Sequence, residues 1–248
     1  MRPPIDSSQT SRSLRRTCAG EGRSNQITGP FSMAAHADDL VAVLDFLGVD
    51  QTTLIGHAMG AFASIVCADY YPDRVQNLVL IDGGIPLELG PIARLPTDQL
   101  LAILIGPALD RLHRTFESVA TYLDYWRRRL ALVDAWNSHK GEAIVYDLGG
   151  QPPTVREDAV IADAESELSR DDFDRVLARL AMPAVLFHAE RGILNQTPPL
   201  YPAYAVAAWL DAAPALRSVN IPNVNHYTIL LTEHGAKTVS DAFEQLLR

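Results

Sequence analysis

Two residues that could perform acid–base chemistry follow apolar runs that we expect to be strands. Asp82 ends the run that begins at Asn77, and His226 comes after the run 216–221. A histidine beside a carboxylate can act as a general base, because the carboxylate stabilises the imidazolium that forms. In open α/β sheets, sites form at the carboxyl ends of the strands. We therefore predict that Asp82 and His226 approach one another at this edge.

A sharp turn marks the same edge of the predicted sheet. The short apolar run Thr53–Ile55 leads into Gly56-His57-Ala58-Met59-Gly60, and a helix is expected from Met59 to Tyr70. Strand, turn and helix are the setting of the nucleophile elbow, Gly-x-Ser-x-Gly. The glycines allow a strained central residue and close packing of strand and helix. Here the central residue is Ala58, whose methyl group cannot attack a substrate.

The elements around this turn alternate between strand and helix. A helix is predicted from Met33 to Leu47, capped by Ser32 and ended by Gly48. The second strand, which begins at Asn77, is a continuous apolar run typical of burial on both faces. The alternation predicts an α/β fold with a mainly parallel sheet. The remaining predicted elements are the strands Pro183–Ala189 and Leu216–Ile221 and the helices Tyr204–Asp211 and Lys237–Leu247.

The middle of the chain lacks this alternation. Helical periodicity predicts helices over Asp98–Ile105, Asp110–Leu132 and Asp171–Leu180, while Glu142–Leu148 is ambiguous. We predict that residues 86–180 form a helical cap inserted into a core. The core then consists of residues 20–85 and 181–248, and residues 1–19 form an irregular tail.

Composition excludes several classes of partner. Of the 248 residues 48% are hydrophobic, which allows a sizeable core, and the net charge of −9 argues against nucleic-acid binding. No apolar run approaches the ~20 residues of a membrane span. Arg15 and Arg16 are not followed by the apolar region of an export signal. Two cysteines, Cys18 and Cys67, cannot build a disulfide framework, so we expect a cytoplasmic protein.

From Gly20 to Arg248 the chain resembles the α/β-hydrolase superfamily in its capped form. The motifs that carry the resemblance occur in the order and spacing of that family. It implies a parallel sheet with the cap inserted after the family's sixth strand. It also implies cleavage of an ester or related bond in a small molecule through a covalent intermediate, without a cofactor. The motifs are Gly20-x-Gly-x-Ser24, Gly56-His57-Ala58-Met59-Gly60, Leu80-Ile81-Asp82-Gly83-Gly84 and Asn223-Val224-Asn225-His226-Tyr227.

The resemblance assigns expected roles to individual residues. His226 matches the general base, and the backbone N–H of Met59 matches one oxyanion donor. The acid usually follows the seventh strand, where this chain has Asn195, an amide that cannot carry the required charge. Some members place the acid after the sixth strand, so we prefer Asp82 as the partner of His226. A purely structural Asp82, bonded to loop amides, is the alternative.

The start of the chain also departs from the family pattern. Only 19 residues precede Gly20, where the family has a hairpin followed by its third and fourth strands. We therefore expect a truncated or replaced start and an open edge on the strand Thr53–Ile55. An open apolar edge invites pairing with a second copy of the chain, so a homodimer is expected through it.

Several aromatic residues could line a ligand pocket. Tyr122, Tyr125 and Trp126 lie in the predicted cap and His57 lies in the turn itself. These residues either form an apolar substrate pocket or merely pack locally, and both interpretations remain open. The histidines show no metal-ligand spacing, so we predict no metal site.

Three hypotheses for function follow from Ala58. The chain is a hydrolase-family protein inactivated at its nucleophile; because serine to alanine preserves the turn, a natural and an engineered origin fit equally. Alternatively it is a non-covalent enzyme, in which His226 with Asp82 acts as base on water or on an acidic C–H bond. The third hypothesis is a binding protein that keeps a pocket without chemistry.

Overall fold

A parallel sheet forms the centre of the molecule. The computed structural model describes residues 13–114, 116–129, 132, 155–168 and 170–246. In this part of the chain four strands pair in the order β1-β2-β3-β4, and every pair is parallel. The predicted α/β fold is confirmed. The strands are β1 (Thr52–His57), β2 (Val75–Ile81), β3 (Ala184–Arg191) and β4 (Leu216–Asn225).

Helices cover both faces of the sheet, so β2 is buried on both sides as predicted. Leu78 and Leu80 belong to one apolar cluster, whereas Val79 and Ile81 belong to a second, because successive strand side chains point to opposite faces. The first cluster includes side chains of α1 (Met33–Leu47), α2 (Met59–Tyr70), α8 (Arg170–Ala178) and α9 (Ala203–Ala212). The second includes those of α10 (Thr228–Leu231) and α11 (Glu233–Leu246).

Local signals set the ends of α1 and α2 where the sequence predicts them. The Ser32 side chain accepts a hydrogen bond from the backbone N–H of Ala35 at 3.1 Å. Gly48 closes α1 in the left-handed region at φ 64°. Short 3₁₀ turns lie at Gly22–Ser24, Pro72–Arg74 and Gly90–Arg94.

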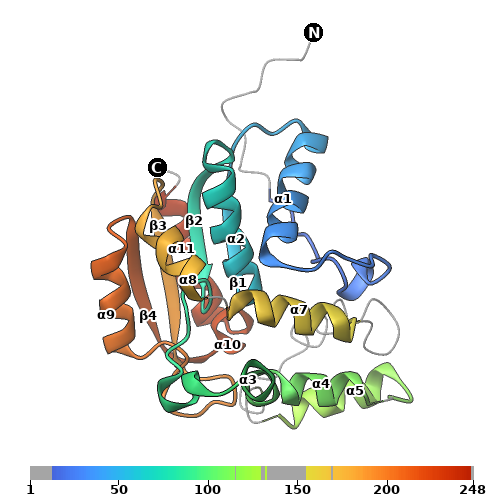
Figure 1. Cartoon of the computed structure of the whole chain (residues 1–248). Coiled ribbons are helices and arrows are strands. Elements are labelled where there is room, and N and C mark those ends of the chain that lie inside the picture. The colour runs from blue at the N-terminus through green and yellow to red at the C-terminus, as the bar shows by residue number, and fades with distance from the viewer. Residues whose placement is uncertain (1–12, 115, 130–131, 133–154, 169, 247–248) are drawn as a thin grey trace.

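Helices inserted between β2 and β3 gather at one end of the sheet (Figure 1). They are α3 (Thr97–Leu104), α4 (Gly106–Leu112), α5 (Val119–Arg127) and α7 (Glu157–Glu167), followed by α8. The expected single helix Asp110–Leu132 is wrong. Ser118 instead caps a new helix by accepting from Thr121 N–H at 3.2 Å, and Phe116 packs its ring 4.9 Å from that of Tyr122. The ambiguous segment 142–148 lies outside the described residues.

Helix α7, which periodicity did not reveal, is docked on α1. Both carboxylate oxygens of Asp163 lie 3.0 Å from His36 Nε2, and both side chains are buried. Next to this pair, Met33 N–H donates to Ser166 Oγ at 3.1 Å. In Figure 1, α7 crosses between α2 and the row α3–α4–α5, so this contact ties the inserted helices to the sheet.

Strand β1 lies at an edge of the sheet. Among the described residues it pairs with β2 alone, and Ile55 in its middle is 51% exposed. The helices in the described part of the chain are all too short or too polar to cross a membrane.

Candidate active site

The turn between β1 and α2 holds a strained residue. Ala58 has φ 49° and ψ −124°, a conformation that side chains with a Cβ rarely adopt. Its N–H donates to the carbonyl of Ile81 at 3.0 Å. A Cβ on Gly56 would overlap the backbone of Gly60, so glycine is needed where strand and helix touch. The geometry of a nucleophile elbow is present, with a methyl group at its centre.

Helix α2 begins immediately after this residue. Met59 is its first residue, so the Met59 N–H is one of those that have no acceptor within the helix. An N–H at a helix start favours developing negative charge. This is the arrangement expected of the predicted oxyanion donor.

The end of β2 packs directly against the turn. Asp82 follows β2 with φ 43°, again in the left-handed region. The next residue, Gly83, lies so close to Ala58 that a Cβ on it would overlap the Ala58 carbonyl. Ala58 is thus flanked by the two neighbours of Asp82, Ile81 and Gly83. Beyond them, the buried Tyr201 hydroxyl donates to the Ile85 carbonyl at 3.1 Å and anchors the segment after Asp82.

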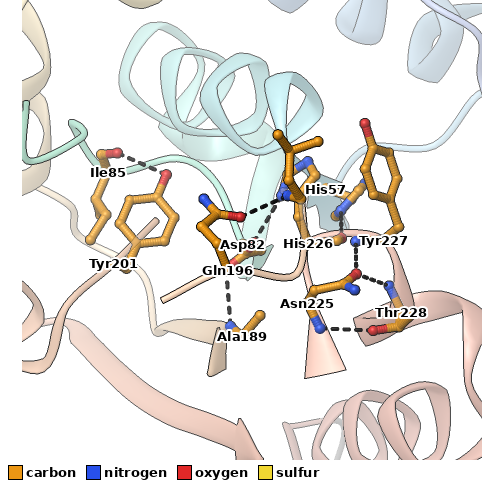
Figure 2. A network of polar contacts seen from close by, with 11 residues as sticks. His57, Asp82, Ile85, Ala189, Gln196, Tyr201, Asn225, His226, Tyr227 and Thr228 are labelled. Atoms are coloured by element: carbon orange, nitrogen blue, oxygen red, sulfur yellow. Dashed lines mark hydrogen bonds and ion pairs between the residues drawn. The ribbon is translucent and has the colours of Figure 1, made fainter. Parts of the chain in front are cut away.

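Asp82 and His226 form a buried pair across 144 residues of chain. His226 Nδ1 lies 2.8 Å from Asp82 Oδ2, while Asp82 Oδ1 accepts from the Ala189 N–H at 3.0 Å (Figure 2). Asp82 is 2% exposed and His226 is 9% exposed. Each Asp82 carboxylate oxygen makes one of these two contacts, and together they orient the carboxylate toward the His226 ring. In the described part of the chain, His226 Nε2 has no hydrogen-bond partner and remains able to take a proton.

His57 stacks beside His226. Their ring centroids are 4.6 Å apart, and His57 Nε2 donates to the His226 carbonyl at 2.9 Å. Burial, with a smaller contribution from His226, lowers the pKa of His57 to about 4. His57 is therefore neutral at pH 7 and adds no positive charge beside His226. The ring contact and the hydrogen bond of His57 hold His226 in place. His226 lies next to Tyr227 in the loop after β4.

Among the described residues, Asn195 forms no hydrogen bond with His226. Its Oδ1 accepts from Asn225 Nδ2 at 3.0 Å, and its backbone has φ 67°. Asn225 in turn accepts from the N–H groups of Tyr227 and Thr228 at 3.0 Å, which shapes the His226 loop (Figure 2). The position where the family pattern has its acid thus supports the loop, and the carboxylate that contacts the histidine is Asp82.

Asn225 and Ala189 are positioning residues that the sequence analysis did not identify. One holds the His226 loop and the other holds Asp82. The Asn225 contacts are local turns of the kind that an Asn side chain commonly forms. The two closely spaced residues Asn223 and Asn225 could therefore have suggested a turn here. Ala189 acts through its backbone, so its residue type carries no signal.

The aromatic residues of the inserted helices reach the histidine loop. Trp126 stacks edge-on at 5.9 Å from Tyr227, whose ring is 5.3 Å from that of His226. Tyr122 and Tyr125 pack beside Trp126 at 6.2 and 5.9 Å. The three predicted pocket residues of the cap are therefore one cluster that ends at the candidate base. Among the described residues, no group of three or more His, Cys, Asp or Glu side chains is arranged to hold a metal ion.

Comparison with known families agrees with this geometry. The sequence model for the α/β hydrolase fold matches residues 6–232, most of the chain. The chain belongs to the α/β-hydrolase fold family. Among its solved structural neighbours, E-2-(acetamidomethylene)succinate hydrolase superposes with a TM-score of 0.68 at 22% identity, covering 91% of this chain and 77% of the other. At that identity the likeness shows the fold alone.

Curated relatives of this α/β-hydrolase are named hydrolases. A candidate carbamate hydrolase, RutD, of a Caulobacter species is 40% identical over 65 residues, covering 26% of this chain and 24% of the relative. A 2-hydroxy-6-oxononadienedioate/2-hydroxy-6-oxononatrienedioate hydrolase of Burkholderia vietnamiensis is 34% identical over 100 residues, covering 39% of this chain and 35% of the relative. The matched segments thus span about a quarter to a third of these relatives' length.

Proposed function

We propose that this α/β-hydrolase-family protein cleaves an ester or similar bond of a small molecule without a covalent intermediate, using His226 as general base on water. The observation that carries the proposal is the buried contact of 2.8 Å between His226 Nδ1 and Asp82 Oδ2. Ala58 supplies no nucleophile, but the pair of His226 and Asp82 is assembled beside the turn that holds it. A base held by a buried carboxylate is the part of a triad that can still activate water.

The proposed reaction needs only groups of this site. His226 Nε2 takes a proton from water as the water oxygen attacks the substrate carbonyl carbon. The carbonyl oxygen becomes negative and is stabilised by the Met59 N–H, while Asp82 stabilises the imidazolium. The C–O bond to the leaving group then breaks, and His226 returns its proton to the departing oxygen. The products are a carboxylic acid and an alcohol.

A ligand-binding protein without chemistry is the second candidate. Ala58 favours it directly, because covalent catalysis through a serine is impossible at that position. In either case we expect a small-molecule ligand rather than nucleic acid, given the net charge of −9. The free thiols Cys18 and Cys67 fit our proposal of a cytoplasmic protein.

Activity of histidine variants tests the proposal. We expect slow turnover of activated esters without an initial burst, and no attachment of fluorophosphonate probes. His226→Asn should lower this turnover by roughly 10²-fold or more, because it removes the base. His234→Asn is the matched control, since His234 is exposed at the start of α11. Turnover that His226→Asn leaves unchanged would refute the role of His226, and saturable ligand binding without any turnover would favour the binding protein instead.

A further inference from the structure

Three arginines of the inserted segment lie on aromatic rings. Arg114 is exposed, with its guanidinium carbon 5.6 Å from the centroid of the Tyr125 ring, whereas Arg111 of α4 and Arg129, which follows α5, are only partly exposed. The Arg111 guanidinium carbon is 5.3 Å from the centroid of the Trp126 ring, and that of Arg129 is 4.3 Å from the Tyr125 ring. Arg111 also donates to the Tyr122 hydroxyl at 3.0 Å. Among the described residues, neither Arg111 nor Arg129 forms an ion pair, in contrast to Arg127 and Arg128, which both pair with Asp124.

A neighbouring arginine of the same segment behaves differently. Arg128 lies within 3.7 Å of Asp124, and its side chain is 82% exposed. Arg111 and Arg129 are only partly exposed. A guanidinium that is partly removed from water and lacks a counter-charge binds an added carboxylate more strongly than an exposed, paired one.

Both arginines lie close to the candidate base. Trp126 contacts Tyr227, and Tyr227 contacts His226. Burial raises the pKa of Tyr227, and the positive charges of Arg111 and Arg129 oppose that rise. Positive charge therefore gathers on the cap side of His226, in a protein whose net charge is −9.

Two further donors in the cluster lack acceptors. The Tyr125 hydroxyl and the Trp126 Nε1 are buried and form no hydrogen bond within the described structure. Leaving a buried donor unpaired costs on the order of 1–3 kcal/mol. The cluster thus combines guanidiniums that form no ion pair among the described residues with two buried hydrogen-bond donors, and the acceptor that it offers Arg111 is the Tyr122 hydroxyl.

We propose that Arg111 and Arg129, with the rings of Tyr125 and Trp126, form a subsite for a carboxylate group of the substrate. The site then selects anionic substrates that carry a carboxylate in addition to the reacting carbonyl. Half-esters of short dicarboxylic acids have this chemistry. Planar guanidinium groups suit it because they can bind both carboxylate oxygens at once. The inference rests on the proposed function for its hydrolytic part, whereas carboxylate binding can be tested without turnover.

Calorimetry measures carboxylate binding at equilibrium, so it tests the subsite separately from ester hydrolysis. The probes are glutarate and glutaramide, which have similar size but differ in charge. We expect glutarate to bind and glutaramide to bind at least 10-fold more weakly. Arg111→Gln and Arg129→Gln should each weaken glutarate binding by about 10-fold or more, whereas Arg128→Gln, with the same loss of charge, should change it less than 2-fold.

Fold integrity and kinetics complete the test. Circular dichroism of each variant identifies loss of folding, and Arg129→Lys keeps the charge and should retain part of the glutarate affinity. If the protein hydrolyses esters, mono-p-nitrophenyl glutarate should show a lower KM than p-nitrophenyl butyrate, and only the former KM should rise in Arg129→Gln. Absence of turnover with intact glutarate binding would refute the proposed function and not the subsite. Equal affinity for glutarate and glutaramide, or equal weakening by Arg128→Gln, would overturn the subsite.

Discussion

At the scale of single residues, backbone strain marks the candidate site. Ala58 and Asp82 both have positive φ at the ends of neighbouring strands. A residue held in such a conformation costs on the order of 1–3 kcal/mol, and strain of this kind clusters at functional sites. Ala58 keeps the strained turn even though its own side chain performs no chemistry. The turn therefore remains able to present a hydroxyl if one is introduced.

Introducing a hydroxyl at position 58 should allow covalent chemistry. In Ala58→Ser, we expect esterase activity to rise by roughly 10²-fold or more, because His226 and Asp82 are already paired and a serine supplies the nucleophile. The measurement is steady-state turnover together with fluorophosphonate labelling. Ala58→Val is the control, since it adds atoms without a hydroxyl. Labelling of Ala58→Ser with no gain in turnover would show that the second oxyanion donor is lacking.

His57 should make the free energy of unfolding depend on pH. Its pKa is about 4 in the folded protein against an ordinary value of 6.5. The unfolded chain binds the proton more readily, so the stabilisation is fully present above pH 6.5 and is lost as the pH falls toward 4. Because His57 is partly buried, we expect a contribution on the order of 1–3 kcal/mol. Urea unfolding of His57→Gln and of the wild type should give free energies that converge over this pH interval. Curves that stay parallel would contradict the assignment.

At the scale of elements, a polar contact docks α7 on α1. The His36–Asp163 pair is buried, and it joins a helix of the sheet layer to an inserted helix. Buried polar contacts of this kind are costly to break singly, because the remaining partner is left without a hydrogen bond. We therefore expect the position of α7 relative to α1 to depend on this pair.

Removing one partner should loosen that helix. In Asp163→Ala, His36 stays buried without its acceptor, and we expect the free energy of unfolding to fall by roughly 2–4 kcal/mol. Chemical denaturation measures the change, and hydrogen exchange of α7 amides should accelerate before the rest of the protein. Asp158→Ala is the matched control on the same helix, where an exposed ion pair with Arg156 is lost. Equal effects of the two substitutions would mean that the buried pair does not hold α7.

At the scale of the whole molecule, the exposed apolar surface near β1 stands out. Ile55 on β1 is 51% exposed, and Phe46 and Leu47 at the end of α1 are 89% and 49% exposed. The backbone of β1 pairs with β2 alone among the described residues. An unpaired strand edge with apolar side chains can pair with the same edge of another copy.

We expect self-association through β1. Size-exclusion chromatography with light scattering should show a dimer of this chain, and Ile55→Lys should shift it toward monomer, because a charged edge residue disfavours strand pairing. Val219→Lys on β4, at the opposite side of the sheet, is the matched control and should leave the dimer intact. A wild-type protein that is monomeric at all accessible concentrations would refute the prediction.

The sequence alone predicted those features that depend on neighbouring residues. Capping by Ser32 and Gly48 and the tight turn at Ala58 are local signals, so the bounds of α1 and α2 agree with the structure. The continuous apolar run of β2 likewise indicated burial on both faces, because a strand with one face in solvent would alternate apolar and polar residues. These features are decided within a few residues of chain and need no knowledge of distant contacts.

Tertiary structure decided which acid meets His226 and how the cap is built. The sequence left Asp82 and Asn195 as alternatives, because the contact spans 144 residues and depends on how β2 and β3 lie in the sheet. Helix α7 escaped detection because its buried positions include Ala159 and Asp163, which form no apolar stripe. Such partners are set by distant packing, which no local pattern encodes.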